Sequence, residues 1–203
     1  MRCCVRVHSG VQHSGKYLSV TRIVQTFRRK IAPALTIWTC FFFTTPLITY
    51  TSRSDYHSRV LQRPIDVEAE LAELPEHWLE DLDIDDMLRR PQLDPSRNKF
   101  KVKAGQSLED WERSGWIRPL DPRGWFQWYY RFFLGRRSAD DARQIGRWLK
   151  ACGPGGRFRK ALAVNVATKG GGRWDDPKVN PVVRQTLWQW GYELTEADYQ
   201  AYL

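Results

Sequence analysis

The strongest constraint on the fold is a block of aromatic residues near the middle of the chain. Seven of the nine residues from 125 to 133 carry aromatic rings. Rings placed so densely fall on nearly every side of a helix, and a helix that is apolar all round must be buried. The block therefore predicts a helix over 122–134 at the centre of a core, with Asp121 as its N-cap and Pro122 at its first position.

Charge divides the 203-residue chain into three segments. Residues 1–54 contain eight Lys or Arg and no Asp or Glu, and residues 55–98 contain twelve acids and five bases. Residues 99–203 contain nineteen bases and eleven acids. With the hydrophobic patterns, this distribution predicts a leader over 1–63, an acidic helical arm over 64–98 and a basic helical domain over 99–203.

Capping signals divide the basic segment into short helices. They stand at Ser107 with Asp110, Ser138 with Asp141, Asn180 with Pro181, and Thr195. A Gly-rich turn over 152–156 precedes a further helix over 157–167, and no strand pattern is recognisable. We therefore expect an all-α fold, a small bundle of four to six short helices with a Trp-rich core, preceded by an irregular leader.

The leader leaves three alternatives open. Residues 17–30 fit a loosely amphipathic basic helix, which is typical of a mitochondrial or plastid presequence. The uncharged stretch from Ile31 to Tyr50 is long enough to span a bilayer, although Pro33 and Pro46 interrupt it. The leader is a cleaved presequence, a membrane anchor, or an untranslated or disordered segment without a role.

The acidic arm begins with a helical stripe formed by Val67, Leu71 and Leu74, which Pro75 ends. Its aspartates at 81, 83, 85 and 86 lack the Gly and the final Glu of an EF-hand loop. A solvated acidic face is the simpler interpretation. The alternative is that the arm folds back on the basic domain and masks it.

Little in the basic domain points to catalysis. All four histidines precede residue 78, and Cys152 is the only thiol after residue 98. The segment thus lacks the commonest general base, the commonest zinc ligand and any disulfide framework. An enzyme would need Cys152 or Asp175–Asp176 in a cleft beside Arg173 or Arg184. No catalytic residue, metal site or cofactor is assigned, and the cysteine usage favours a reducing compartment, in an organelle if the leader is a presequence.

Basic residues on two successive helices favour a polyanion as the partner, with nucleic acid as the first candidate. The segment 121–184 holds fourteen bases and five acids. A Gly-rich turn joins the two helices roughly as in a helix-turn-helix, so the start of the second helix would meet phosphates. The predicted contact residues are Arg143, Arg147, Lys150, Arg157, Arg159 and Lys160.

Two other interpretations compete with polyanion binding. The arginines can simply solubilise a small domain and stack on its own tryptophan rings. Alternatively, the rings form an aromatic groove and the domain serves protein–protein interaction or assembly, which predicts several tryptophans exposed on one face. A membrane partner is expected only if residues 31–50 are retained as an anchor.

Three runs of sequence carry a resemblance to a known family. They are DPRGWFQWYYRFFLGRR, DDARQIGRWLKACGPGGRFRKAL and NPVVRQTLWQWGYEL, which begin at residues 121, 140 and 180. The chain from about Gln106 to Leu194 resembles a family of uncharacterised conserved proteins that share a DPxGWFQWY, GRR and DDxRQIxRW signature. The resemblance implies a real domain over this range, and it implies no activity, cofactor or ligand.

Overall fold

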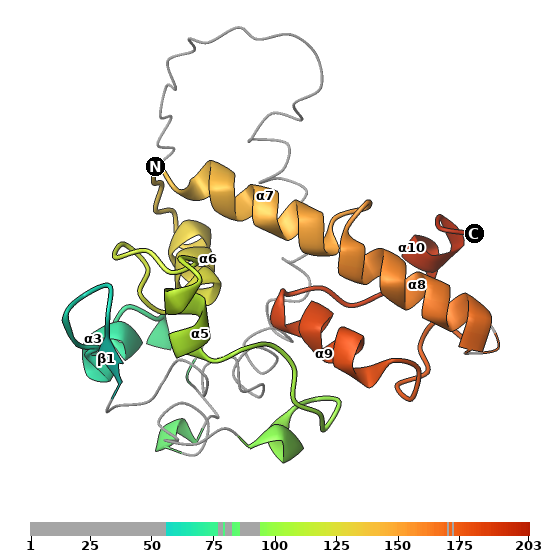
Figure 1. The fold of residues 1–203 in the computed structure, drawn as a ribbon, viewed down its shortest axis with the longest axis horizontal. Helices are drawn as coiled ribbons and strands as arrows, with labels where there is room; N and C mark the ends of the chain where they lie inside the picture. The colour runs from blue at the N-terminus through green and yellow to red at the C-terminus, as the bar shows by residue number, and fades with distance from the viewer. Residues whose placement is uncertain (1–55, 77–78, 80–82, 86–93, 170, 172) are drawn as a thin grey trace, which may run out of the picture. The chain divides into compact units, whose positions relative to one another are not determined.

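The chain folds mainly into helices (Figure 1). The computed structural model describes residues 56–76, 79, 83–85, 94–169, 171 and 173–203. In chain order the elements are β1 (His57–Ser58), β2 (Arg63–Pro64), α3 (Val67–Leu71), the 3-10 helix η3 (Pro95–Arg97), α5 (Leu108–Arg113), α6 (Trp125–Phe133), α7 (Asp141–Cys152), α8 (Arg157–Lys169), α9 (Pro181–Gln189) and α10 (Glu196–Gln200). The predicted helical fold is confirmed, and the described part of 99–203 holds the six α-helices from α5 to α10.

Most of the predicted leader, with its candidate membrane span at 31–50, lies outside the described residues. The same is true of Asp81 and Asp86 in the acidic arm. No helix in the part of the chain that the structure describes is long and apolar enough to cross a membrane.

Helix α6 is the centre of the aromatic core, as the ring density predicted. Seven of its nine residues are buried, and Trp128 is only 1% exposed. Rings four residues apart lie on the same face of the helix and stack, at 5.0 Å between centroids both for Trp125 with Tyr129 and for Trp128 with Phe132. The prediction of a Trp-rich core is confirmed.

The start of α6 differs from the prediction. The helix begins at Trp125, its N-cap is Gly124, and Asp121 caps nothing. Gly124 has φ +78°, and a Cβ at this position would lie 2.8 Å from Cδ1 of Ile117, so glycine alone fits here. Asp121 is 1% exposed and accepts hydrogen bonds from Arg131 and Arg136 instead.

The other capping predictions are mostly confirmed. Ser107 and Asp110 form a complete capping box at α5, and the side chains of Asn180 and Thr195 cap α9 and α10. Helix α7 is the exception, because its N-cap residue is Asp140 and no side chain caps it. Ser138 still pairs with Asp141, to which its amide and hydroxyl both donate, at 3.0 and 2.7 Å.

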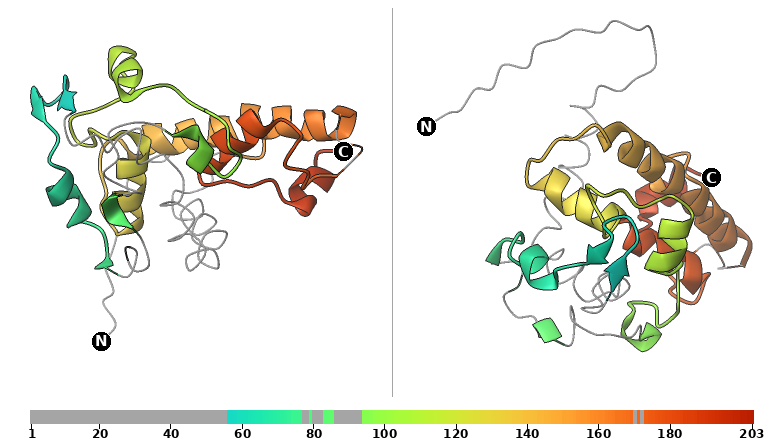
Figure 2. Two further views of the ribbon diagram at one scale, coloured as in Figure 1. Left: turned by 90° about the horizontal axis from the view of Figure 1, so that it is seen from below. Right: turned by 60° about the vertical axis from the view of Figure 1, so that its left-hand side comes forward.

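Helices α7 and α8 follow one another end to end, and α9 packs along α8 (Figures 1 and 2). The turn over 153–156 joins them so tightly that a Cβ on Gly156 would lie 2.6 Å from the carbonyl oxygen of Ala151. Buried residues of these helices and of the C-terminal segment form a second core cluster. Its members are Ala151, Cys152, Leu162, Ala163, Val166, Val179, Leu187, Leu194 and Tyr199.

A two-stranded antiparallel hairpin, β1–β2, precedes the helices and was not predicted. Ser58 pairs with Arg63 and His57 with Pro64, so the expected end of the leader at residue 63 lies within the hairpin. Tyr56 and Ile65, on either side of it, pack with Leu108 and Ile117 in a small core cluster. The hairpin is therefore attached to α5.

Candidate functional site

The six basic residues predicted to contact a polyanion all lie on α7 and α8, but they fall into two groups. Lys150, Arg157 and Lys160 are exposed, and they form no ion pair with a described carboxylate. We call these three residues the basic face. Arg143, Arg147 and Arg159 are partly buried and are held by neighbouring side chains.

Two of the held arginines form ion pairs. Arg143 binds Asp140 through two contacts, Nε–Oδ1 at 2.5 Å and Nη2–Oδ2 at 2.7 Å. Burial alone would raise the pKa of Asp140, but these hydrogen bonds and the charge of Arg143 hold it below its usual value. Arg159 pairs with Asp198 of α10 at 2.7 Å. Both arginines therefore already have carboxylate partners, and the pair of Arg159 also joins α8 to α10.

The guanidinium of Arg147 contacts two indole rings. Its guanidinium carbon lies 4.7 Å from the ring centroid of Trp116 and 5.5 Å from that of Trp190. Its Nη1 donates to Oε1 of Gln144 at 2.8 Å. Burial, with repulsion from Arg143, lowers the pKa of Arg147 to about 10, so the group stays charged at neutral pH. No described carboxylate forms an ion pair with it, and its charge is compensated mainly by the two rings.

The stretch of chain that carries the basic face is rich in bases, and Asp198 of α10 pairs with Arg159 within it. Residues 142–174 contain eight Lys or Arg and no Asp or Glu. The exposed positions of α8 include Arg157, Lys160 and Val164, spaced three and four residues apart, which places them on one side of the helix. The field over this side is therefore positive.

The end-to-end course of α7 and α8 differs from a helix-turn-helix. In that motif the two helices cross at about 90–120°. Figures 1 and 2 show the Gly-rich turn carrying the chain onward from α7 into α8 without such a crossing. The start of α8 is thus in the middle of a long helical edge, and Arg157 does not lead a protruding recognition helix.

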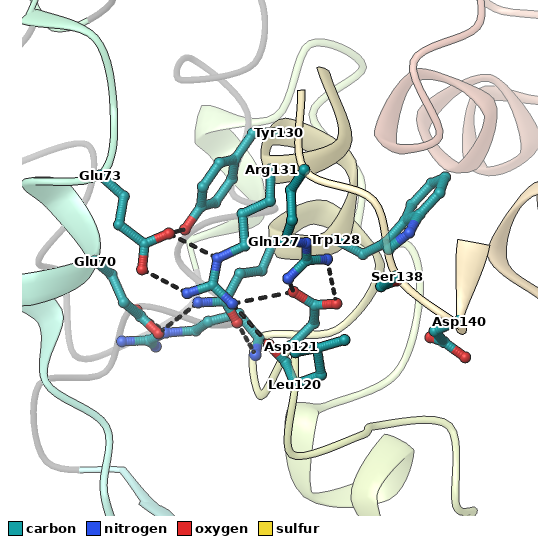
Figure 3. Close-up of polar contacts among 12 residues, drawn as sticks. Glu70, Glu73, Leu120, Asp121, Gln127, Trp128, Tyr130, Arg131, Ser138 and Asp140 are labelled. Carbon is teal, nitrogen blue, oxygen red and sulfur yellow. Dashed lines mark hydrogen bonds and ion pairs between the residues drawn. The ribbon is translucent and has the colours of Figure 1, made fainter. Parts of the chain in front are cut away.

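A second cluster of charged groups joins α3 to α6 (Figure 3). Glu73 accepts hydrogen bonds from Nε and Nη2 of Arg131 at 2.6 and 2.5 Å and from the hydroxyl of Tyr130 at 3.1 Å. Asp121 bridges Arg131 and Arg136. The described acidic arm therefore folds back on the basic segment, but it pairs with Arg131 of α6 and with Arg123 just before α6, and not with the basic face.

Glu70 is the most buried arm carboxylate in this cluster. It accepts from Nε of Arg123 at 2.5 Å and from Nε2 of Gln127 at 3.0 Å. Burial raises the pKa of Glu70 in spite of these partners. Burial likewise acts to raise the pKa of Glu73, but the bonds from Arg131 and Tyr130 outweigh it and lower that pKa. Three carboxylates and three guanidiniums meet here, so the cluster is electrically balanced.

The residues considered for catalysis do not come together with an activated group. Cys152 is 0% exposed, and burial raises the pKa of its thiol well above the usual range. Arg184 is buried and donates to the carbonyls of Val179 and Trp174. Asp175 forms an exposed pair with Arg173. No three His, Cys, Asp or Glu side chains among the described residues are grouped to hold a metal ion.

Tryptophan exposure separates one residue from the rest. Of the eight tryptophans that the structure describes, only Trp116 is exposed, at 45%. It was not among the predicted contact residues, because it follows Gly115 in an irregular segment between two helices. One sequence signal could have found Trp116. The ring directly follows a helix-ending glycine and precedes Ile117, which is buried, so it belongs to no helical face.

Comparisons of the chain with protein-family models, with curated proteins and with solved structures gave no match.

Proposed function

We propose that the protein binds a polyanion, nucleic acid in the first place, through the basic face of α7 and α8. The observation that carries the proposal is the exposure of Lys150, Arg157 and Lys160 in a stretch of chain without acidic residues. Lysine and arginine side chains in such a setting contact phosphate oxygens and release the counterions around them.

The partly buried arginines support this surface in a different way. Arg159 ties α8 to α10, Arg143 pairs with Asp140 at the start of α7, and Arg147 adds a charge with no carboxylate partner in the described part. These three therefore set the shape and the field of the face. The three exposed side chains make the phosphate contacts, with little discrimination between base sequences.

Protein–protein interaction through an aromatic groove is the second candidate. This interpretation predicts several tryptophans exposed on one face, whereas only one of the eight described tryptophans is exposed. No specific observation favours it, and we retain it as an outcome of the experiment below.

The test is a titration of the full-length chain with labelled DNA and RNA over a range of salt concentrations. We expect the logarithm of the affinity to fall with the logarithm of salt with a slope of about −2 to −3 for three phosphate contacts. The double charge reversal Arg157→Glu with Lys160→Glu should reduce this slope by about 2 and weaken binding to all sequences alike.

The matched control makes the same charge change elsewhere. Lys101 and Lys103 are also exposed bases and lie outside the basic face. Lys101→Glu with Lys103→Glu alters the net charge by the same amount. An equal loss of affinity in both double variants would therefore show a general charge effect. Absence of binding at low salt would refute the proposal and direct the search to a protein partner.

A further inference from the structure

Trp116 stands at the outer end of a series of packed aromatic rings and one guanidinium, which we call the column, that reaches into the core. The guanidinium of Arg147 lies 4.7 Å from the ring centroid of Trp116 and 5.5 Å from that of Trp190. Trp190 in turn packs on Trp125 at 4.9 Å, and Trp125 on Tyr129 at 5.0 Å. The inner members belong to the buried aromatic core, so the column is anchored.

The backbone beneath Trp116 is fixed as well. Its amide donates to the carbonyl of Trp111 at 2.9 Å, and Gly115 before it adopts φ +70°. Ile117 after it is buried, at 4% exposed. The fixed backbone and the contact with Arg147 restrict the ring, while 45% of the residue remains exposed. Leaving so large an apolar surface in water costs free energy that burial of the same ring would recover.

Trp116 contacts the side of α7 that also carries Lys150 of the basic face. Nη1 of Arg143 donates to the carbonyl oxygen of Trp116 at 3.4 Å, and the guanidinium of Arg147 lies over the ring of Trp116. Lys150 follows Arg147 by three residues, on the same side of the helix and about one turn further on. Beyond the Gly-rich turn, Arg157 and Lys160 continue the basic face on α8.

We infer that Trp116 is a stacking platform for an unpaired base, and that the polyanion is single-stranded nucleic acid. This inference rests on the proposed function and narrows it to one class of ligand. A base placed on the exposed part of the indole extends the column by one member, and its flanking phosphates meet Lys150, Arg157 and Lys160 along the helical edge. A stacking ring and a positive track are the two parts of single-strand recognition.

A duplex fits this arrangement less well. Its bases are already stacked on one another, so they cannot cover Trp116 without being unpaired. The ring is also fixed before binding, which removes the ordering cost that a mobile side chain would add. Neither DNA nor RNA is preferred by stacking alone, because every base offers a flat π-face.

The experiment compares four ligands of equal length, which are oligothymidylate, oligouridylate, an abasic phosphodiester strand and a duplex. The wild-type chain should bind the two strands with bases at least ten-fold more tightly than the abasic strand, and more tightly than the duplex at matched salt. The variant Trp116→Leu keeps an apolar side chain but no ring, and it should bind oligothymidylate on the order of ten-fold more weakly. Its affinity for the abasic strand should not change.

Two further variants separate stacking from folding. Trp116→Phe retains a ring and should keep most of the affinity. Tyr202→Leu removes another exposed ring, 42% exposed near the C-terminus, and should bind like the wild type. Near-ultraviolet circular dichroism confirms that each variant is folded.

The outcomes distinguish the inference from the proposed function. If Trp116→Leu binds every strand as the wild type does while Arg157→Glu with Lys160→Glu abolishes binding, the stacking inference is wrong and polyanion binding stands. A wild-type chain that prefers the duplex or the abasic strand also overturns the inference. If no ligand binds at low salt, both fail.

Discussion

The hydroxyl of Tyr56 donates a 2.6 Å hydrogen bond to Oε2 of Glu112, which joins the start of the described chain to α5. Ser58 donates to the other oxygen at 2.7 Å, and the amide of Arg59 donates to Oε2 at 3.1 Å. Glu112 is 8% exposed, and these donors stabilise its charge, since no basic side chain of the described residues forms an ion pair with it. The hairpin therefore belongs to the same folded unit as the helices.

Removing this hydroxyl should destabilise the fold. Tyr56→Phe leaves the ring in its cluster but takes one donor from a buried carboxylate, which costs roughly 1.5–3 kcal/mol for a bond to a charged group. Urea denaturation measures the change in the free energy of unfolding. Tyr202→Phe, at an exposed position, serves as the control and should be neutral. Equal stability of the two variants would mean that the hydrogen bond from Tyr56 to Glu112 contributes nothing to stability.

The same contact predicts a dependence of stability on pH. Burial acts to raise the pKa of Glu112, but the bonds from Tyr56, Ser58 and the backbone outweigh it and lower that pKa. A lowered folded-state pKa adds stability above the ordinary glutamate pKa of about 4.3, and that stability is lost as the pH falls through the folded value. The difference between the denaturation midpoints of the wild type and Tyr56→Phe should thus shrink as the pH falls below about 4. A difference between the two midpoints that stays constant with pH would contradict the role of the Glu112 carboxylate in this contact.

The pairing of the arm with α6 predicts a second stability effect. Glu73→Gln removes the carboxylate that binds Arg131 through two contacts, and we expect a loss of about 1 kcal/mol because the pair is partly exposed. Glu76→Gln removes the same charge three residues away, at an exposed position, and should change stability by less than about 0.5 kcal/mol. Thermal unfolding of both variants at low and high salt separates the specific pair from general screening.

Local sequence predicted the parts of this fold that depend on local physics. The ring density of α6 and the capping residues at Ser107, Asn180 and Thr195 were sufficient, because a buried helix and an N-cap are set by residues close in the chain. Asp121 shows the limit. Its position before Pro122 suits an N-cap, but two guanidiniums ten and fifteen residues away compete for the same carboxylate and prevail.

The hairpin and the candidate site show the same limit. Strands of two residues have no detectable alternation, and the partner that stabilises this pair, Glu112, is more than fifty residues away. The basic residues of α7 and α8 were found from their spacing, but spacing did not reveal that Arg143 and Arg159 have carboxylate partners. Nor did it reveal Trp116, whose exposure depends on how Arg147 and Trp190 pack.

The turn between α7 and α8 offers a matched pair of glycines for the last prediction. A Cβ on Gly156 would lie 2.6 Å from the carbonyl carbon and oxygen of Ala151 and 2.7 Å from the amide nitrogen of Cys152, whereas a Cβ on Gly155 would meet nothing within 4 Å. Backbone atoms of α7 cannot move aside without opening the turn, so Gly156→Ala should cost about 2 kcal/mol or more. Gly155→Ala should be neutral or slightly stabilising, because alanine restricts the unfolded chain. Urea denaturation of the two variants measures the difference in the free energy of unfolding. Equal stabilities would show that the turn between α7 and α8 is not as tightly packed as its geometry indicates.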